Sequence, residues 1–209
     1  MPGKLFIIAA ASGTGKTTLV RALCRNLPNL RVSISSTTRP MRPGERDGVD
    51  YNFINDATFD RMVTEKKFLE YETVFDYRYG TPREWVENQL RAGTDIILEI
   101  DWKGARSVRA LAPGCIGIFL LPPGFAELEQ RLCGRAQDNK ATIQRRMRAA
   151  LEELSHYREF DYLVINDDLD SALAELQEII ESSRKGQRII TPDRREFAEH
   201  LMTEGGKLK

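Results

Sequence analysis

The sequence lacks long apolar runs and an excess of either charge. No stretch approaches the roughly 18 consecutive apolar residues of a membrane-spanning helix, so a membrane protein is not expected. The 209 residues include 31 basic and 31 acidic side chains, and this balance creates no overall field that would attract nucleic acid or an anionic membrane. Any site for an anion must therefore be a local cluster of basic residues.

Cysteine is also scarce. Cys24, Cys115 and Cys133 are odd in number and have neither CxxC nor metal-ligand spacing, which favours buried thiols in a reducing compartment over a disulfide framework. The apolar run at 5–11 follows a single basic residue, Lys4, and is at the short end for a signal peptide. The motif after this run also needs it as a strand, so we expect a cytoplasmic protein.

Four apolar runs without polar alternation predict the strands of a parallel sheet. A hydrophobic content of 41% supplies enough apolar side chains for a substantial core. The runs occupy 5–11, 95–100, 116–121 and 162–165, and each is followed by a segment of helical periodicity. The predicted helices are 16–25, 82–92, 102–111, 125–133, 142–160 and 169–183. This order predicts an α/β fold of three layers, with helices on both faces of the sheet.

Residues 35–81 break this rhythm. They contain a basic loop, an aromatic strand at 51–54, a short helix at 57–65 and a strand at 68–72. We interpret them as a subdomain inserted into a core made of 1–34 and 82–185. The tail at 186–209 is charged, contains Pro192 and has one weak helical stretch at 196–202, so we expect it to be peripheral.

The segment "AASGTGKTT" follows the first strand and has the composition of a phosphate-binding loop (P-loop). Glycines let backbone N–H groups converge on an anion, and the N-terminus of the next helix adds partial positive charge. The first position of GxxxxGK[ST] is here Ala10, which still adopts most strand-end conformations. Lys16 is predicted to bridge the β and γ phosphates of a triphosphate, and the Thr17 hydroxyl to ligate Mg²⁺. The predicted triphosphate-binding residues are Ala10, Ala11, Ser12, Gly13, Thr14, Gly15, Lys16, Thr17 and Thr18.

A second anion site is predicted in the basic loop "SSTTRPMRPGERDGVDYNF". Arg39 and Arg42 lie three residues apart, and Pro40 and Pro43 stiffen the backbone beside them. This stiffness reduces the entropy lost when both guanidiniums turn toward one point. Two such groups would grip a phosphate dianion through charge-assisted hydrogen bonds, and Tyr51 would add a phenolic donor.

The same loop, read as "TTRPMRPGERDGVDYNFI", resembles the signature of guanylate kinases. Other similar segments are "FLEYETVFDYRYGT", "LEIDWKGA", "LPP", "RLCGRAQD", "RRM" and "VINDDLD", and together they cover about residues 4–183. The resemblance implies a three-layer P-loop NTPase fold with a parallel core sheet, a GMP-binding subdomain at 35–81 and a helical lid at about 134–146. It also implies an ATP:GMP phosphotransferase that uses Mg²⁺ and has the small molecules ATP and GMP as partners.

The resemblance further assigns GMP-binding residues. It implies that the phosphate is bound by Arg39, Arg42, Tyr51 and Tyr79, and the guanine by Ser35, Glu70 and Thr81. A carboxylate accepts from both the N1–H and the amine of guanine, whereas adenine has an acceptor at N1, so Glu70 would favour guanine. Other interpretations stay open: Glu70 as a solvated edge carboxylate, and Tyr79 and Thr81 as a plain turn. Thr81 would also cap the helix that starts at Pro82.

Three polar residues follow buried strands. Glu99 and Asp101 stand at the strand end where parallel sheets place ligands. Guanylate kinases usually have Asp where Glu99 stands, so the detailed role of Glu99 is open. Asp101 matches the family, and would reach either the guanine amine or the hydration shell of Mg²⁺. Asn166 matches a position near the adenine of ATP, and would alternatively cap the helix that follows.

Six basic residues lie between 131 and 148, from the end of one predicted helix through the predicted lid into the next helix: Arg131, Arg135, Lys140, Arg145, Arg146 and Arg148. Arg145 and Arg148 lie opposite the apolar stripe of that helix and are expected on the surface, whereas Arg146 borders the stripe. The segment "GRAQDNKA" has the polar makeup of a mobile lid. The resemblance implies that catalytic arginines close over ATP, namely Arg131, Arg135 and Arg146. Guanylate kinases commonly have Gly where Ala136 stands, which predicts slightly stiffer closure.

Two rival functions are compatible with the fold. A P-loop kinase with another phosphorylated acceptor, such as a sugar phosphate, would not need Ser35, Glu70 and Thr81, because such acceptors have no base edge. A non-catalytic guanylate-kinase-like protein-binding module typically lacks a working P-loop, whereas Lys16 and Thr17 are present here. The sequence does not give the oligomeric state.

Overall fold

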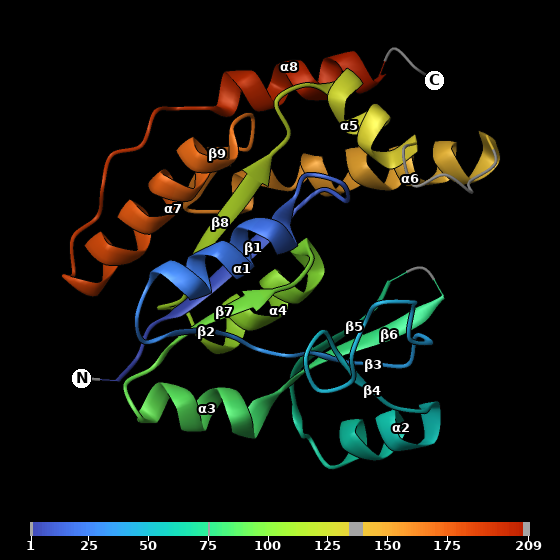
Figure 1. Ribbon diagram of the computed structural model, residues 1–209, viewed down its shortest axis with the longest axis vertical. Helices are drawn as coiled ribbons and strands as arrows, with labels where there is room; N and C mark the ends of the chain where they lie inside the picture. Colours follow the sequence, from blue (N-terminus) through green and yellow to red (C-terminus); the bar gives the residue numbers. More distant parts are fainter. Residues whose placement is uncertain (1, 75, 134–139, 207–209) are drawn as a thin grey trace. The chain divides into compact units, whose positions relative to one another are not determined.

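The computed structural model describes residues 2–74, 76–133 and 140–206, and their side chains except those of 133 and 140–144 (Figure 1). The chain divides into two compact units, the first made of 1–6 and 29–115 and the second of 7–28 and 116–209. Strand β1 (Leu5–Ala10) begins in the first unit and ends in the second.

The parallel strands β2 and β7, with the start of β1 next to β7, form one part of the first unit. β2 (Leu30–Val32) pairs with β7 (Asp95–Glu99), and the N–H of Ile96 donates to the carbonyl O of Lys4 beside the start of β1. Helix α3 (Arg83–Arg91) precedes β7 and packs against it, and α4 (Trp102–Leu111) follows it. Ile96 and Ile97 are fully buried, as expected for a parallel strand covered on both faces.

A mostly antiparallel sheet in the order β4-β3-β6-β5 forms the other part of the first unit. Its strands are β3 (Ser36–Thr37), β4 (Asn52–Phe53), β5 (Phe68–Val74) and β6 (Tyr77–Pro82). Helix α2 (Asp56–Thr64) begins after Asn55, whose side chain accepts a hydrogen bond from the N–H of Thr58 and so caps the helix. Phe59 of α2 packs on Phe68 of β5 with ring centroids 4.6 Å apart, which attaches the helix to the sheet.

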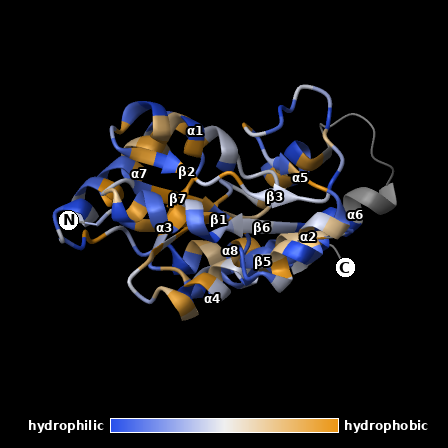
Figure 2. Ribbon diagram, turned by 90° about the horizontal axis from the view of Figure 1, so that it is seen from below, coloured by the Kyte–Doolittle hydropathy of each residue, from blue (hydrophilic) through white to orange (hydrophobic). Residues whose placement is uncertain are grey.

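The second unit has parallel strands in the order β1-β8-β9. β8 (Ile116–Leu121) pairs with β9 (Tyr162–Ile165), and Ile118 lies opposite Tyr162. The helices are α1 (Lys16–Asn26), α5 (Phe125–Cys133), α6 (Lys140–Ser155), α7 (Leu169–Arg184) and α8 (Arg195–Gly206), with a 3₁₀ turn η1 (Tyr157–Glu159) after α6. α1 packs against α7, and the core beside α5, α6 and α8 includes Phe119, Leu128 and Leu154. Figure 2 shows helices with both hydrophobic and hydrophilic residues, as expected of helices that cover a sheet.

The predicted α/β fold with a parallel core sheet is confirmed, and the four apolar runs are strands. The sequence does not predict β2, β3 or β6. β2 and β3 have three and two residues, too few to show a period, and β6 contains Gly80 and Pro82, which are typical of turns. The helix predicted at 142–160 ends at Ser155, where η1 follows.

The expectation of a peripheral tail is wrong. Ala198 and Leu201 of α8 are each 1% exposed and belong to the core of the second unit. Arg194 anchors the segment before α8, because its NH1 group donates to the carbonyl O of Leu163 at 2.6 Å and its guanidinium pairs with Glu175. The many charges of the tail obscure the apolar face of this helix in the sequence.

Further expectations concern cysteines, membrane spans and domain boundaries. Cys115 is buried and Cys24 half-buried, and both are thiols. Within 2–74, 76–133 and 140–206, no helix is both long enough and apolar enough to cross a membrane. The division into core, inserted subdomain and tail stays a prediction.

Candidate active site

The predicted phosphate-binding loop connects β1 to α1 in the second unit. Gly13 and Gly15 have φ angles of 89° and 96°, left-handed values that favour glycine. Ala10 ends β1 without a positive φ, so a methyl group fits where the motif has its first glycine. Lys16 and Thr17 form the start of α1, where the helix N-terminus favours an anion.

Hydrogen bonds within the loop and from α6 hold the backbone of this loop. The N–H of Thr14 donates to the carbonyl O of Ala11 at 3.2 Å, and the N–H of Ser12 donates to Oε2 of Glu153 on α6 at 2.8 Å. Thr14 is fully buried, and its hydroxyl has no hydrogen-bond partner among the described residues. Ser12 and Thr18 are exposed. The loop is therefore fixed on its inner side and open on its outer side.

Asn166 holds the same loop from the end of β9. Its Nδ2 donates to the carbonyl O of Thr14 at 2.6 Å, and its side chain is 6% exposed. A Cβ at Gly15 would lie only 2.6 Å from this Nδ2, so the contact itself requires glycine there. The interpretation of Asn166 as a helix cap is wrong, because Asp168 caps α7 by accepting from the N–H of Ser171 at 2.8 Å.

Arg131 is the predicted lid arginine that the structure places beside this loop. Its Nε pairs with Oε1 of Glu127, one helical turn earlier on α5, at 3.0 Å. Its NH1 group lies 3.5 Å from the carbonyl O of Thr14, which it approaches as a donor. A cation is thus held next to the backbone that is predicted to bind triphosphate.

The other basic residues of this region have different placements. Arg146 is half-buried, whereas Arg145 and Arg148 are exposed, as the apolar stripe predicts. Arg135 and Ala136 lie outside the described residues, as do all of residues 134–139, which begin the predicted lid at about 134–146.

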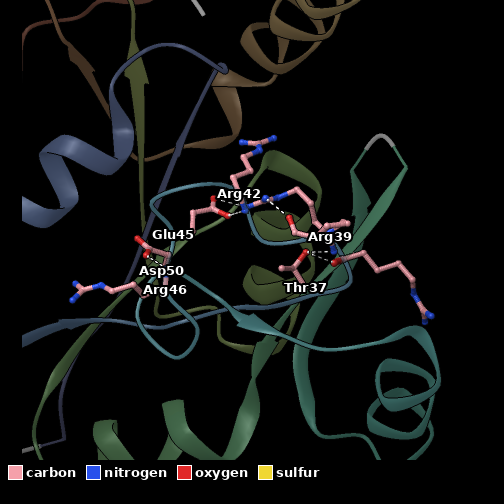
Figure 3. Close-up of polar contacts among 8 residues, drawn as sticks. Thr37, Arg39, Arg42, Glu45, Arg46 and Asp50 are labelled. Atoms are coloured by element: carbon pink, nitrogen blue, oxygen red, sulfur yellow. Dashed lines mark hydrogen bonds and ion pairs between the residues drawn. The ribbon is translucent and has the colours of Figure 1, made fainter.

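Arg39 is the most firmly held member of the predicted phosphate cluster in the first unit (Figure 3). Its side chain is 5% exposed; its NH2 group donates to Oε1 of Glu45 at 2.6 Å and its NH1 group to the carbonyl O of Pro40 at 2.8 Å. The guanidinium also lies over the rings of Tyr51 and Phe53, 5.3 and 5.7 Å from their centroids. These contacts fix its plane before any oxyanion arrives.

Glu45 connects Arg39 to Arg42. Its Oε2 accepts from the N–H of Arg42 at 2.8 Å, and its own N–H donates to the carbonyl O of Arg42 at 3.1 Å, closing a turn through Pro43 and Gly44. The hydrogen bond from Arg39 holds the pKa of Glu45 below its usual value. The Arg42 guanidinium is exposed and points away from Glu45 (Figure 3). Of the two predicted phosphate-binding arginines, Arg39 is therefore held in place and Arg42 is open to solvent.

Tyr51 and Tyr79 belong to the same cluster. Their rings meet edge to face with centroids 5.9 Å apart. Tyr79 lies in β6 opposite Thr37 of β3, so the interpretation of Tyr79 as part of a plain turn is wrong. Burial, followed by the charge of Glu99, raises the pKa of Tyr51 to about 12, and its hydroxyl therefore stays a donor at neutral pH.

Glu70 and Thr81 are partners across β5 and β6, and the Thr81 hydroxyl donates to Oε1 of Glu70. Glu70 is 6% exposed, so the interpretation as a solvated edge carboxylate is wrong. Burial raises the pKa of Glu70 to about 7; the hydrogen bond from Thr81 opposes this rise, and the charges of Asp101 and Glu72 add to it. Thr81 does not cap α3, whose N-cap residue is Pro82, because its hydroxyl already binds Glu70.

Asp101 and Ser35 are the remaining predicted GMP ligands. Asp101 caps α4, since its Oδ1 accepts from the N–H of Gly104 at 2.8 Å. Ser35 is half-buried directly before β3, and its carbonyl O accepts from the N–H of Asn52 at 2.9 Å. A hollow of about 420 Å³ is lined by residues 69–73 of β5, which include Glu70, and by Ser107 of α4.

Comparison with known proteins decides the family. The family model described as guanylate kinase matches residues 2–183. The chain belongs to the guanylate kinase family. The resemblance predicted from the motifs is thereby confirmed.

Individual guanylate kinases support this membership. The guanylate kinase of Methylococcus capsulatus is 53% identical over 182 residues, which cover 87% of this chain and 89% of that protein. The guanylate kinase of Coxiella burnetii is 52% identical over 180 residues, covering 86% and 87%. The crystal structure of guanylate kinase from Anaplasma phagocytophilum is 28% identical with a TM-score of 0.73, and the match covers 87% of this chain and 86% of that one. The P-loop NTPase fold is confirmed by this likeness.

The guanylate kinase motifs do not predict what Glu45 and Gly104 contact. Glu45 stands three residues after Arg42 with Pro43 and Gly44 between them, which is the pattern of a four-residue turn and would have indicated the contact. Gly104 lies against Glu70, far away in the sequence, and no local signal identifies that approach. The nucleotide-binding roles of the predicted site residues stay predictions.

Proposed function

We propose that this guanylate kinase family member transfers the γ-phosphoryl group of ATP to GMP, giving ADP and GDP. One observation carries the proposal: the buried Glu70 on β5 and the guanidinium of Arg39, which Glu45 holds two residues after β3, belong to the same small sheet and its adjoining loop. GMP has a phosphate dianion at one end and a base edge with N–H donors at the other. The names of the guanylate kinase relatives support the same reaction.

The phosphate of GMP would be bound by two arginines and two tyrosines. Arg39 supplies a guanidinium whose plane is already set by Glu45, and Arg42 supplies one that is free to turn inward from solvent. Tyr51, whose raised pKa keeps it protonated, would donate a neutral hydrogen bond, with Tyr79 beside it. This combination would neutralise the acceptor phosphate without fully immobilising it.

The guanine would be read by Glu70, with the base also contacting Ser35 and Thr81. The carboxylate accepts from the N1–H and the 2-amino group together, and adenine offers no equivalent pair of donors. Because Glu70 is buried, a base that fails to donate leaves the carboxyl group with the hydrogen bond from Thr81 but without those from the base, which is costly. Asp101 would contact either the guanine amine or the hydration shell of Mg²⁺.

ATP would be bound by the loop from Ala10 to Thr18. Lys16 would contact the β and γ phosphates, and Asn166 would act by holding the loop backbone. Thr17 fits a Mg²⁺ ligand, because its hydroxyl is a hard oxygen donor exposed in the first turn of α1. Mg²⁺, when bound with ATP, supplies charge neutralisation on the phosphates.

The transfer would need no general base. The second pKa of a phosphate monoester is about 6, so the acceptor oxygen is already largely ionised at neutral pH. Catalysis then consists of positioning and neutralisation of charge. Lys16 would neutralise charge on the triphosphate, and Arg39 and Arg42 would position and neutralise the acceptor phosphate. The lid arginines would stabilise charge on the moving phosphoryl group, and these are Arg131, Arg135 and Arg146. Lid closure at about 134–146 would exclude water and suppress hydrolysis of ATP.

Two alternatives make different predictions. A related P-loop kinase for another phosphorylated acceptor has no use for a buried carboxylate at Glu70, and a protein-binding module has no use for Lys16.

We also propose that 35–81 acts as the GMP-binding subdomain. A cytoplasmic location agrees with the thiols of Cys24 and Cys115.

ADP release with ATP and a panel of acceptors tests the proposal. GMP should support turnover, whereas AMP, CMP, UMP and sugar phosphates should not. Lys16→Met should abolish transfer while GMP still binds, as measured by calorimetry. Equal turnover with AMP or a sugar phosphate would favour the related kinase. Absence of turnover with every acceptor would favour the protein-binding module. Near-normal turnover of Lys16→Met would contradict the assignment of the P-loop.

A further inference from the structure

The first turn of α4 lies against the carboxylate of Glu70. α4 packs on β5, the strand that carries Glu70, within the first unit. Asp101 caps this helix through the N–H of Gly104, which places Gly104 in its first turn. Gly104 is buried there. The side of α4 that faces Glu70 therefore has no side chain at this position.

The space beside Gly104 is occupied by that carboxylate. A Cβ on Gly104 would lie 2.8 Å from Oε2 of Glu70, 3.3 Å from its Cδ and 3.4 Å from Oδ1 of Asp101. Gly104 has an ordinary helical conformation rather than a positive φ, so its backbone does not require glycine. Glycine is also a poorer helix residue than alanine. The close approach of Glu70 is the reason that the structure offers for glycine here.

We propose that Gly104 is a positioning residue that sets where the Glu70 carboxylate stands and thereby tunes selectivity for guanine. This inference rests on the proposed function. One oxygen of the carboxylate is held by the Thr81 hydroxyl, and the other is placed by the bare Cα of Gly104. The two contacts come from different elements, β6 and α4, and lie at the two oxygens of the carboxylate.

The geometry of guanine recognition makes this position sensitive. The N1–H and the 2-amino group present two parallel donors, so both carboxylate oxygens must be in place at once. Ordinary contact between a Cβ and a neighbouring atom begins at 3.4 Å, so a methyl group on Gly104 would displace Oε2 by about 0.6 Å from its 2.8 Å separation. Because the displaced atom ends a flexible side chain, the fold tolerates the change while the pair of hydrogen bonds does not.

Gly104→Ala tests the proposal. We expect the KM for GMP to rise about tenfold, the loss that accompanies one weakened hydrogen bond to a charged group, while the KM for ATP changes less than twofold. The preference for GMP over inosine monophosphate, which lacks the 2-amino group, should fall by a similar factor. The unfolding midpoint should stay equal or increase, since alanine is the better helix residue. Gly114→Ala is the matched control, because Gly114 is exposed after α4 with open space around it and should change none of these values.

A double-mutant cycle separates positioning from a general structural effect. In a Glu70→Ala background, adding Gly104→Ala should change the KM for GMP less than twofold, because no carboxylate remains to be displaced. An unchanged KM for GMP in the single variant overturns the inference. A tenfold rise in the KM for GMP that persists in the Glu70→Ala background also overturns it. So does a fall in stability accompanied by equal rises in the KM for ATP and for GMP. Turnover of the wild-type protein is measured first. If it is absent, both the proposed function and this inference are overturned. If the wild type is active and Gly104→Ala has an unchanged KM for GMP, the inference alone is overturned.

Discussion

Replacing Glu70 by Gln should remove one pH dependence from the stability of this protein. Glutamine has nearly the same shape but no titrating group, so the variant is a baseline without the charge. In the native chain the carboxyl is buried and receives a hydrogen bond from Thr81. Burial dominates, and the pKa of Glu70 is raised from 4.5 to about 7.

The raised pKa gives the magnitude of the effect. The pKa rises from 4.5 to about 7, and at about 1.4 kcal/mol for each pH unit the ionised form is disfavoured by roughly 3–4 kcal/mol. Since the Glu70 side chain is only 6% exposed, solvent screens this cost very little.

The direction follows from where the proton is bound more tightly. The folded chain keeps the Glu70 proton up to about pH 7, whereas the unfolded chain releases it near 4.5. The contribution to stability is therefore fully present below 4.5 and is lost as the pH rises through about 7. Between pH 5 and pH 8, wild type should lose about 2.5 kcal/mol of unfolding free energy relative to Glu70→Gln.

Denaturant unfolding of both proteins between pH 5 and pH 8 measures this difference, because all other titrating groups are shared and cancel. Thr81→Val provides a second arm: without the opposing hydrogen bond, the midpoint of the pH dependence should move to higher pH. A difference between wild type and Glu70→Gln that stays constant within about 0.5 kcal/mol would refute burial as the dominant influence on this carboxyl.

Two further predictions concern the second unit. Asn166→Asp replaces the donor that faces the carbonyl O of Thr14 with a buried acceptor, so the free energy of unfolding should fall by about 3 kcal/mol. The KM for ATP should rise, whereas the KM for GMP should not. A variant as stable as wild type would contradict the contact between Asn166 and Thr14. Leu201→Ala should destabilise the protein by roughly 2–5 kcal/mol in the same unfolding assay. Leu169→Ala, at an exposed position, should cost no more than about 0.5 kcal/mol, and equal losses for the two leucines would show that α8 is not part of the core.

The parts of the site that could be predicted from the sequence are those with short-range causes. The loop from Ala10 to Thr18 is recognisable because the glycines, the lysine and the helix start are contiguous, and the structure has left-handed φ angles at Gly13 and Gly15. The order of strands and helices also follows from local sequence patterns, since uninterrupted apolar runs are typical of strands buried on both faces.

The parts that could not be predicted depend on pairing between distant segments. β6 contains Gly80 and Pro82 and reads as a turn, yet it is a strand because β3 and β5 pair with its two edges. That pairing gives the Thr81 hydroxyl to Glu70 instead of to α3. Asn166 reads as a helix cap, yet its amide is used by the backbone of Thr14, 152 residues away.

The sequence by itself determined which functional groups this protein has. They are a glycine-rich loop next to Lys16, arginines flanked by prolines, and apolar runs that form parallel strands. Tertiary structure alone decided how these groups are tuned. It buried Glu70 and raised its pKa, set Glu45 on Arg39, and left no side chain at Gly104 where the carboxylate needs room. The physical reason is that backbone propensity and apolar periodicity act over a few residues, whereas desolvation, charge and close packing act between groups that only folding brings together.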